Sequence, residues 1–207
     1  MGVNGVMATT MEIPTAADSE ASRQRMLRAQ AGDEAARDEL ALECGRDAFA
    51  FALQLTRDRE DALDVAQETV LRLFRSLGRF DAERPLRPWL LSIARNLVRD
   101  RWRRSRKRRP VELEADLLVD ASEAGDPERR LRRVELQRRV WRALAGLPEE
   151  AREIIVLRDY RDCSYAEIAQ ILEIPVGTVM SRLHRARARL ARILRATDAP
   201  GGEKRDD

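Results

Sequence analysis

The segment Ser164–Leu190 constrains the fold of this chain more than any other part of the sequence. Ser164 and Glu167 stand three residues apart just before an apolar run. This spacing predicts a helix start at which each side chain satisfies a free backbone N–H of the other residue. The apolar positions that follow at helical spacing are Ile168, Ile171 and Leu172. They indicate a short amphipathic helix.

A second helix is predicted after a corner of about three residues. Pro175 suits the first turn of a helix, because its φ is fixed and its missing N–H costs nothing there. One side of this helix is apolar, at Val179, Leu183, Ala186 and Leu190. The other side carries Ser181, Arg182, His184, Arg185 and Arg189. Such a pair is typical of a helix-turn-helix that reads the major groove of duplex DNA, although the arginines could also only solvate a surface helix.

The formal net charge of +3 conceals a strong sorting of charge along the chain. Residues 95–109 hold nine basic residues and one acid, whereas residues 110–128 hold seven acids and no base. Blocks of this kind favour two different partners, or one partner with two kinds of surface. The acidic, unpatterned stretch predicts a linker over residues 108–130, with a helix restarting near Pro127.

In the first half of the chain, a helix is predicted from Arg59 to about Leu77. Asp61, Asp64 and Glu68 fall on one face of it, so their charges repel one another unless a basic group covers them. A solvated surface, with aspartate favouring the helix start, is the alternative.

The next predicted helix, from Trp89 to about Arg104, begins after a loop that contains Phe80. One polar face of this helix includes Arg95, Asn96, Arg99 and Arg103. An aromatic residue beside such a face suits an unpaired nucleic-acid strand, whose bases stack and whose phosphates meet guanidinium groups. Taken alone, however, Phe80 and Trp89 fit a core role better.

Composition sets the remaining expectations. With 207 residues and 43% hydrophobic content, the chain has room for one or two small cores. We expect an all-α protein of two small helical domains, at residues 23–107 and 131–195, with disordered tails at residues 1–22 and 196–207. No signal peptide or apolar run of membrane-spanning length is visible, which favours a cytoplasmic protein without membrane insertion.

Enzymatic and metal-binding roles find little support in the sequence. His184 is the only histidine, and Cys44 and Cys163 have neither metal-ligand nor disulfide spacing. We therefore expect no catalytic residues, no metal and no cofactor. The two thiols fit buried, inert cysteines better than redox sensors.

Two separate stretches resemble one family, the extracytoplasmic-function sigma factors of bacterial RNA polymerase. The stretch DREDALDVAQETVLRLFRSLGRF, followed by WLLSIARNLVRDRWRR, resembles sigma region 2. The stretch LPEEAREIIVLRDYRDCSYAEIAQILEIPVGTVMSRLHRARARL resembles sigma region 4. The resemblance implies a subunit that binds core RNA polymerase, selects promoters and promotes their melting.

The resemblance also implies roles for particular residues. Those at positions that dock on the clamp helices of the β′ subunit are Asp61, Asp64, Gln67 and Glu68. Those at positions near the melted minus-10 element are Phe80, Trp89, Arg95, Asn96, Arg99 and Arg103. Those at positions that meet the duplex minus-35 element are Ser181, Arg182, His184, Arg185 and Arg189. Region 4 would also pack on the flap of the β subunit, and an anti-sigma factor would be a further partner.

Three positions depart from the family pattern. Leu86 replaces a common aromatic residue and Leu63 a common glutamate, while Met180 replaces a common lysine or arginine. The main alternative function is a stand-alone helix-turn-helix regulator that binds an operator without polymerase.

Overall fold

The structure is a computed structural model of the chain, and it describes residues 16–105 and 127–198. These two ranges contain helices and no strand, so the all-α prediction is confirmed. Residues 108–126 of the predicted linker lie outside the described residues, as do residues 1–15 and 199–207 of the predicted tails, whereas residues 127–130 are helical. None of the described helices combines the length and the apolarity that crossing a membrane requires.

Four helices form the first half of the molecule: α1 (Ala16–Gln30), α2 (Glu34–Thr56), α3 (Arg59–Ser76) and α4 (Leu86–Ser105). A single 3₁₀ turn, η1 (Leu77–Arg79), follows α3. Helix α1 begins at Ala16, within the range that the sequence analysis assigned to the N-terminal tail.

The second half contains α5 (Pro127–Ala145), α6 (Glu149–Ile155), α7 (Tyr165–Leu172) and α8 (Val176–Asp198). A five-residue π-helical segment, η3 (Val156–Tyr160), continues α6. Helix α5 begins at Pro127 as predicted, and α8 extends to Asp198, beyond the predicted domain end at residue 195.

Aspartate side chains cap the starts of α2 and α3. The carboxylate of Asp33 accepts a hydrogen bond from the backbone N–H of Ala36, and that of Asp58 accepts one from Asp61. Gly32, at a φ of +95°, makes the turn that separates α1 from α2. These caps satisfy backbone donors that have no partner inside the helix.

Two apolar clusters hold the fold together. The smaller one packs α1, the first part of α2, the end of α3 and the start of α4 around Met26, Leu40, Leu73 and Leu90. The larger cluster is shared by both halves: it joins Phe51 and Leu91 of the first half to Ile154 and Ile168 of the second. The two halves therefore form one packed body, which the prediction of two tethered domains did not include.

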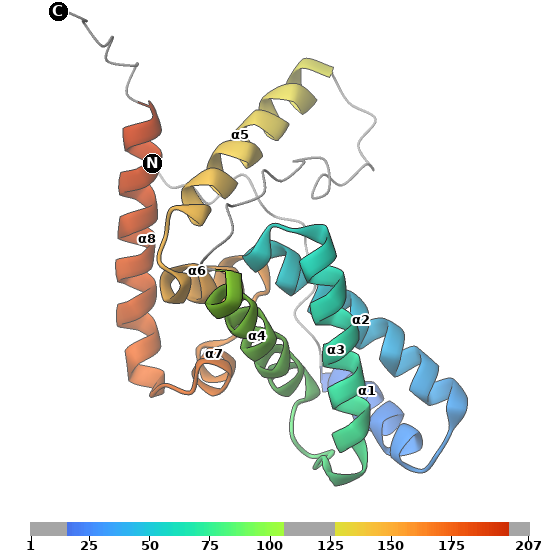
Figure 1. The fold of residues 1–207 in the computed structure, drawn as a ribbon. Helices are drawn as coiled ribbons and strands as arrows, with labels where there is room; N and C mark the ends of the chain where they lie inside the picture. Colours follow the sequence, from blue (N-terminus) through green and yellow to red (C-terminus); the bar gives the residue numbers. More distant parts are fainter. Residues whose placement is uncertain (1–15, 106–126, 199–207) are drawn as a thin grey trace, which may run out of the picture.

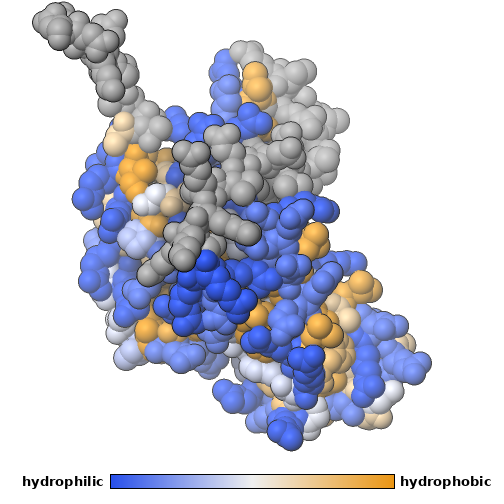
Figure 2. All heavy atoms as spheres, in the orientation of Figure 1, coloured by the Kyte–Doolittle hydropathy of each residue, from blue (hydrophilic) through white to orange (hydrophobic). Residues whose placement is uncertain are grey.

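Helix α4 lies at the junction between the halves. In Figure 1, α2 and α3 flank α4 on one side, while α6 and α7 approach it from the other, and α8 stands at the outer edge. Figure 2 shows a mainly hydrophilic surface in the same view, with apolar side chains interspersed where α3 lies. Leu63 and Leu71 of α3 are among the exposed large apolar residues.

Candidate functional site

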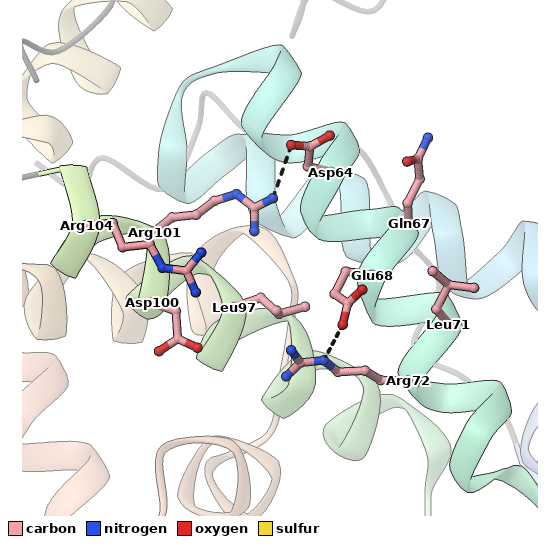
Figure 3. A pocket seen from close by; sticks show the side chains of 9 residues that line it. All are labelled: Asp64, Gln67, Glu68, Leu71, Arg72, Leu97, Asp100, Arg101 and Arg104. Atoms are coloured by element: carbon pink, nitrogen blue, oxygen red, sulfur yellow. Dashed lines mark hydrogen bonds and ion pairs between the residues drawn. The ribbon is translucent and has the colours of Figure 1, made fainter.

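The acidic face of α3 borders a groove of about 350 Å³ between α3 and α4. Asp64, Gln67 and Glu68 line it from α3. In Figure 3, Asp64 faces Arg101 of α4, Glu68 is joined to Arg72 of its own helix, and Gln67 points away from α4. Gln67 and Asp64 are exposed, and Asp61 and Glu68 are half-buried. The structure thus brings the four predicted polymerase-binding residues together on one accessible surface.

Basic side chains of the chain itself already cover these acids. Arg101 of α4 lies 3.4 Å from Asp61 and 3.3 Å from Asp64, measured between Arg101 nitrogens and carboxylate oxygens. Within α3, Arg72 donates a hydrogen bond of 2.7 Å to Glu68, and this bond lowers the pKa of the Glu68 carboxyl. Because the side chains of Asp61, Asp64 and Glu68 are 46%, 68% and 34% exposed, a basic partner can reach these carboxylates and exchange with their present partners at little cost.

An aromatic pair borders a second hollow, beside the start of α4. The rings of Phe80 and Trp89 stack with centroids 4.3 Å apart and an interplanar angle of 19°. The side-chain amide of Gln30 donates to the backbone carbonyls of Leu77, at 2.8 Å, and Phe80, at 2.7 Å. Gln30 thereby fixes the loop that carries Phe80. Both rings also pack against the smaller apolar cluster, so they combine a core role with an accessible edge.

The predicted DNA-binding residues of α4 lie in different environments. Asn96 is exposed on α4, the helix that begins beside the aromatic hollow. Arg103 is also exposed, and it forms an ion pair with Asp100. Arg95 is buried, and its Nε donates to the Glu153 carboxylate at 2.9 Å. Arg99 lies 3.9 Å from the same carboxylate. The sequence placed these four residues on one polar face, but the structure buries Arg95.

The helix-turn-helix has the local geometry that its sequence predicted. Ser164 and Glu167 form a reciprocal capping box, with hydrogen bonds of 3.2 Å and 2.7 Å. Helix α7 ends at Glu173 in the left-handed conformation, with φ at +56°. Pro175 stands just before α8, and its carbonyl accepts a hydrogen bond from Thr178. The corner therefore turns without a glycine.

Helix α8 buries its apolar side and presents its polar side. Val179, Leu183 and Ala186 are buried, and Leu190 is half-buried against the larger cluster. Ser181, His184, Arg185 and Arg189 are exposed, and Arg182 is half-buried at 4.0 Å from Glu150. Met180, which is 63% exposed, adds an apolar side chain to this surface. The five predicted residues therefore lie together along a surface that a DNA groove can reach.

Both cysteines are free and buried. Burial raises the pKa of the Cys44 thiol to about 12 and that of Cys163 to about 11. Among the described residues, no group of His, Cys, Asp or Glu side chains is arranged to hold a metal ion.

Four residues that shape these surfaces were missed by the sequence reasoning. They are Arg72, Arg101, Glu153 and Gln170. The i, i+4 spacing of Glu68 and Arg72 was a usable signal, because such residues are neighbours on a helix. Glu153 and Gln170 reach α4 only through the packing of the two halves, for which the sequence offers no local pattern.

Two protein-family profiles match the chain. The profile described as "Sigma-70 region 2" covers residues 40–108, and the one described as "Sigma-70, region 4" covers residues 137–190. These ranges contain the α3–α4 surfaces and the helix-turn-helix, respectively.

Curated proteins from several bacteria are similar to the chain. The RNA polymerase sigma-H factor of Pseudomonas aeruginosa is 33% identical over 185 residues, which cover 84% of this chain and 94% of that protein. The ECF RNA polymerase sigma factor SigW of Bacillus subtilis is 33% identical over 177 residues, covering 72% of this chain and 90% of that protein.

Solved structures share the arrangement of helices. The structure of CnrH in complex with the cytosolic domain of CnrY has a TM-score of 0.64 at 28% identity and covers 85% of this chain and 98% of that chain. The sigma factor RpoE of Bartonella quintana, crystallised with the anti-sigma factor NepR, has a TM-score of 0.58 at 26% identity. This match covers 76% of this chain and 96% of that chain.

Proposed function

The chain belongs to the extracytoplasmic-function group of the sigma-70 family, and we propose that three of its surfaces divide the work of promoter-specific initiation. As a sigma factor, it binds core RNA polymerase, directs it to promoters and promotes their melting. The comparisons support this function and not that of a stand-alone regulator.

The first surface is the acidic face of α3, which we assign to the clamp helices of the β′ subunit. This assignment is supported by the exposed positions of Asp64 and Gln67 beside a groove whose ion pairs can exchange their partners. When a basic partner arrives, Arg101 can release Asp61 and Asp64, since a shared exposed ion pair contributes little free energy.

The second surface is the loop and helix around the Phe80–Trp89 pair, which we assign to the melted minus-10 element. An unstacked base can lie against the exposed edge of the aromatic pair. The exposed side-chain amide of Asn96 can then form hydrogen bonds with the polar edge of that base. Arg99 and Arg103 can then meet the phosphates of the same strand.

The third surface is the outer face of α8, which we assign to the minus-35 duplex. Arg185 and Arg189 are exposed on this face, and Ser181 and His184 lie between them and the corner. Arginine can bond guanine in the major groove in a bidentate manner, so Arg185 is the candidate base reader. Region 4 would also contact the β flap.

No chemical step is assigned to the chain itself. The polymerase forms the phosphodiester bonds, and the sigma factor lowers the free energy of melted promoter DNA relative to duplex. We place this action in the cytoplasm, where polymerase and promoter meet, and we regard an anti-sigma factor as a further partner, as in the RpoE complex.

Transcription with purified core polymerase tests this proposal. The full chain should direct initiation from specific sites in genomic DNA, and core polymerase alone should not. A gel shift with and without core polymerase distinguishes this function from that of a stand-alone regulator. Tight binding of a specific operator by the free chain, or a failure to direct initiation at any site, would refute the proposed function.

A further inference from the structure

The first turns of α8 carry two exposed apolar side chains. Val176 is 52% exposed and Met180 is 63% exposed. Within the described part of the chain, the two apolar clusters include neither side chain. Single apolar residues are common on protein surfaces and need no function. Residues four apart, however, are neighbours on a helix, so Val176 and Met180 form one continuous apolar edge.

This apolar edge borders the polar face of α8 that we assign to the minus-35 duplex. At 3.6 residues per turn, Met180 lies within about 40° of both Val176 and His184 around the helix axis. Arg182 and Arg189 lie about half a turn away, on the opposite edge of the polar face. The face therefore has one cationic edge and one apolar edge.

Arg187 shares the apolar edge, but its charge is already paired. It lies about two turns after Met180. Its Nε donates a hydrogen bond of 3.1 Å to one oxygen of Asp159, and its Nη2 donates to the other oxygen of the same carboxylate. A two-point pair of this kind holds the guanidinium group against η3. The apolar edge therefore offers DNA an apolar contact near the start of α8 and little positive charge.

Thymine presents the matching chemical group in the major groove. Its C5-methyl group distinguishes it from the other bases there, and apolar side chains read this group by contact. The residues of a recognition helix that reach base edges are those near its N-terminus. Val176 and Met180 occupy the first turns of α8, which meets no base in any other way at these positions. The methionine side chain is also unbranched, so it can adapt to the surface that it meets.

We propose that Met180, with Val176 beside it, reads thymine methyl groups in the minus-35 duplex, so that this edge of α8 selects A·T base pairs. This inference rests on the proposed function, because it uses the assignment of α8 to that duplex. It adds a second determinant of promoter choice to the guanine contact assigned to Arg185. The methionine at position 180 thus replaces a charged contact by an apolar one.

Deoxyuridine in place of thymine tests the contact directly, because it lacks only the C5-methyl group. The probe is a promoter fragment from a start site that the full chain selects in genomic DNA, with the thymines of the minus-35 element replaced one at a time. Holoenzyme with the unchanged chain should bind about fourfold more weakly when the contacted thymine is replaced, as the loss of one buried methyl group predicts. Equal affinity for all the fragments would overturn the proposal.

Replacement of Met180 by alanine identifies the side chain that makes the contact. Met180→Ala should bind the thymine fragment about fourfold more weakly and should no longer distinguish it from the deoxyuridine fragment. Met180→Leu keeps an apolar side chain and should restore the distinction. Leu42→Ala is the matched control, because Leu42 is 60% exposed and lies on α2. It should behave as the unchanged chain.

The opposite outcome is equally clear. If Met180→Ala still distinguishes thymine from deoxyuridine, Met180 serves another contact, such as one with a protein partner, and the proposal is wrong.

Salt dependence separates a methyl contact from a phosphate contact. An apolar contact releases no counterions, so Met180→Ala should lower the affinity without changing the slope of log affinity against log salt. A slope that changes by about 1, as expected for the loss of one phosphate contact, would contradict the proposal.

A change of chemistry at position 180 gives an independent measurement. Met180→Arg places a cation on the apolar edge, where it can bond guanine. In a selection from fragments randomised at the methyl-sensitive base pair, the unchanged chain should retain A·T and the variant should retain G·C. Retention of the same thymine by both proteins would refute the assignment.

Initiation at genomic sites by the unchanged chain is scored first. Its absence would refute the proposed function, whereas initiation without sensitivity to the thymine methyl group would refute only the role of Met180.

Discussion

Asn96 and Arg95 are adjacent on α4, yet one is exposed and the other is buried against Glu153. The sequence grouped them because both fit one polar helical face. It could not show that a carboxylate 58 positions away along the chain takes Arg95 out of solvent. The Asn96 role stays a prediction, and its exposure makes it the more direct residue to test.

Replacement of Asn96 by alanine should lower open-complex formation about fivefold, since one hydrogen bond of about 1 kcal/mol to the unstacked base is lost. Permanganate reactivity of promoter thymines measures the melting. Binding to core polymerase should not change. Gln24→Ala, an exposed amide on α1, is the matched control and should leave melting unaltered. Normal reactivity with Asn96→Ala would exclude the proposed contact.

The two thiols should be unreactive in the native protein. Burial raises their pKa values above the ordinary 9.0, to about 12 for Cys44 and about 11 for Cys163. At pH 8 the thiolate is therefore scarce, and a thiol reagent should react only after denaturant is added. The same shift means that folding stability holds below pH 9 and falls as the pH rises towards 11. Rapid modification at pH 8 would support a redox role instead.

Helix boundaries were the most predictable features at the scale of secondary structure. The capping residues Asp33, Asp58 and Ser164 act on backbone groups within three positions, so a local pattern was sufficient. The start of α1 at Ala16 was missed, because its first residues have no apolar periodicity. The π-helical segment after α6 was also missed, since it appeared as the continuation of an ordinary helix.

The capping box of α7 offers a prediction for a whole helix. Ser164→Ala should destabilise the protein by about 1 kcal/mol, because the backbone N–H of Glu167 loses its acceptor. Urea denaturation followed by circular dichroism measures the change. Ser76→Ala is a matched control: Ser76 precedes η1 without a capping hydrogen bond from its side chain. A similar loss in both variants would show that the capping bond contributes nothing specific.

For the whole molecule, the all-α class and the order of sigma regions 2 and 4 followed from sequence, while the packing of the halves did not. Periodicity reports which side of a helix is apolar, as on α8, but not which distant helix covers it. An α4 residue such as Leu97 could be assigned to the apolar side of its helix, though not to a core shared with Ile168. The complementary charges of Asp47 and Arg161 likewise give no indication in the sequence that these two residues pair in the folded chain.

The internal pairing of arginines predicts how salt affects DNA binding. The chain has 39 basic residues, but several are bound to its own acids, among them Arg87, Arg95 and Arg101. The free chain should therefore show a slope of log affinity against log salt of only about −3 to −5 on a minus-35 duplex. Fluorescence anisotropy of a labelled duplex measures the affinity at salt concentrations from about 50 to about 300 mM, and these affinities give the slope.

Two alanine variants check the origin of that slope. Arg189→Ala removes an exposed arginine of α8 and should reduce the slope by about 1. Arg101→Ala removes a cation that faces Asp61 and Asp64, so the slope should hardly change. An equal effect of both substitutions would mean that total charge, and not the α8 surface, governs binding.

The bond between Arg95 and Glu153 also limits how freely parts of such proteins can be exchanged. Engineers who graft a foreign C-terminal module onto residues 16–105 replace the side chain at position 153 without altering Arg95. A graft that lacks an acid there leaves a buried cation without its counter-ion, and such hybrids should be less stable and more readily opened. Modules that retain the acid keep the counter-ion of Arg95, so position 153 is one of the positions at which the compatibility of such a graft can be judged.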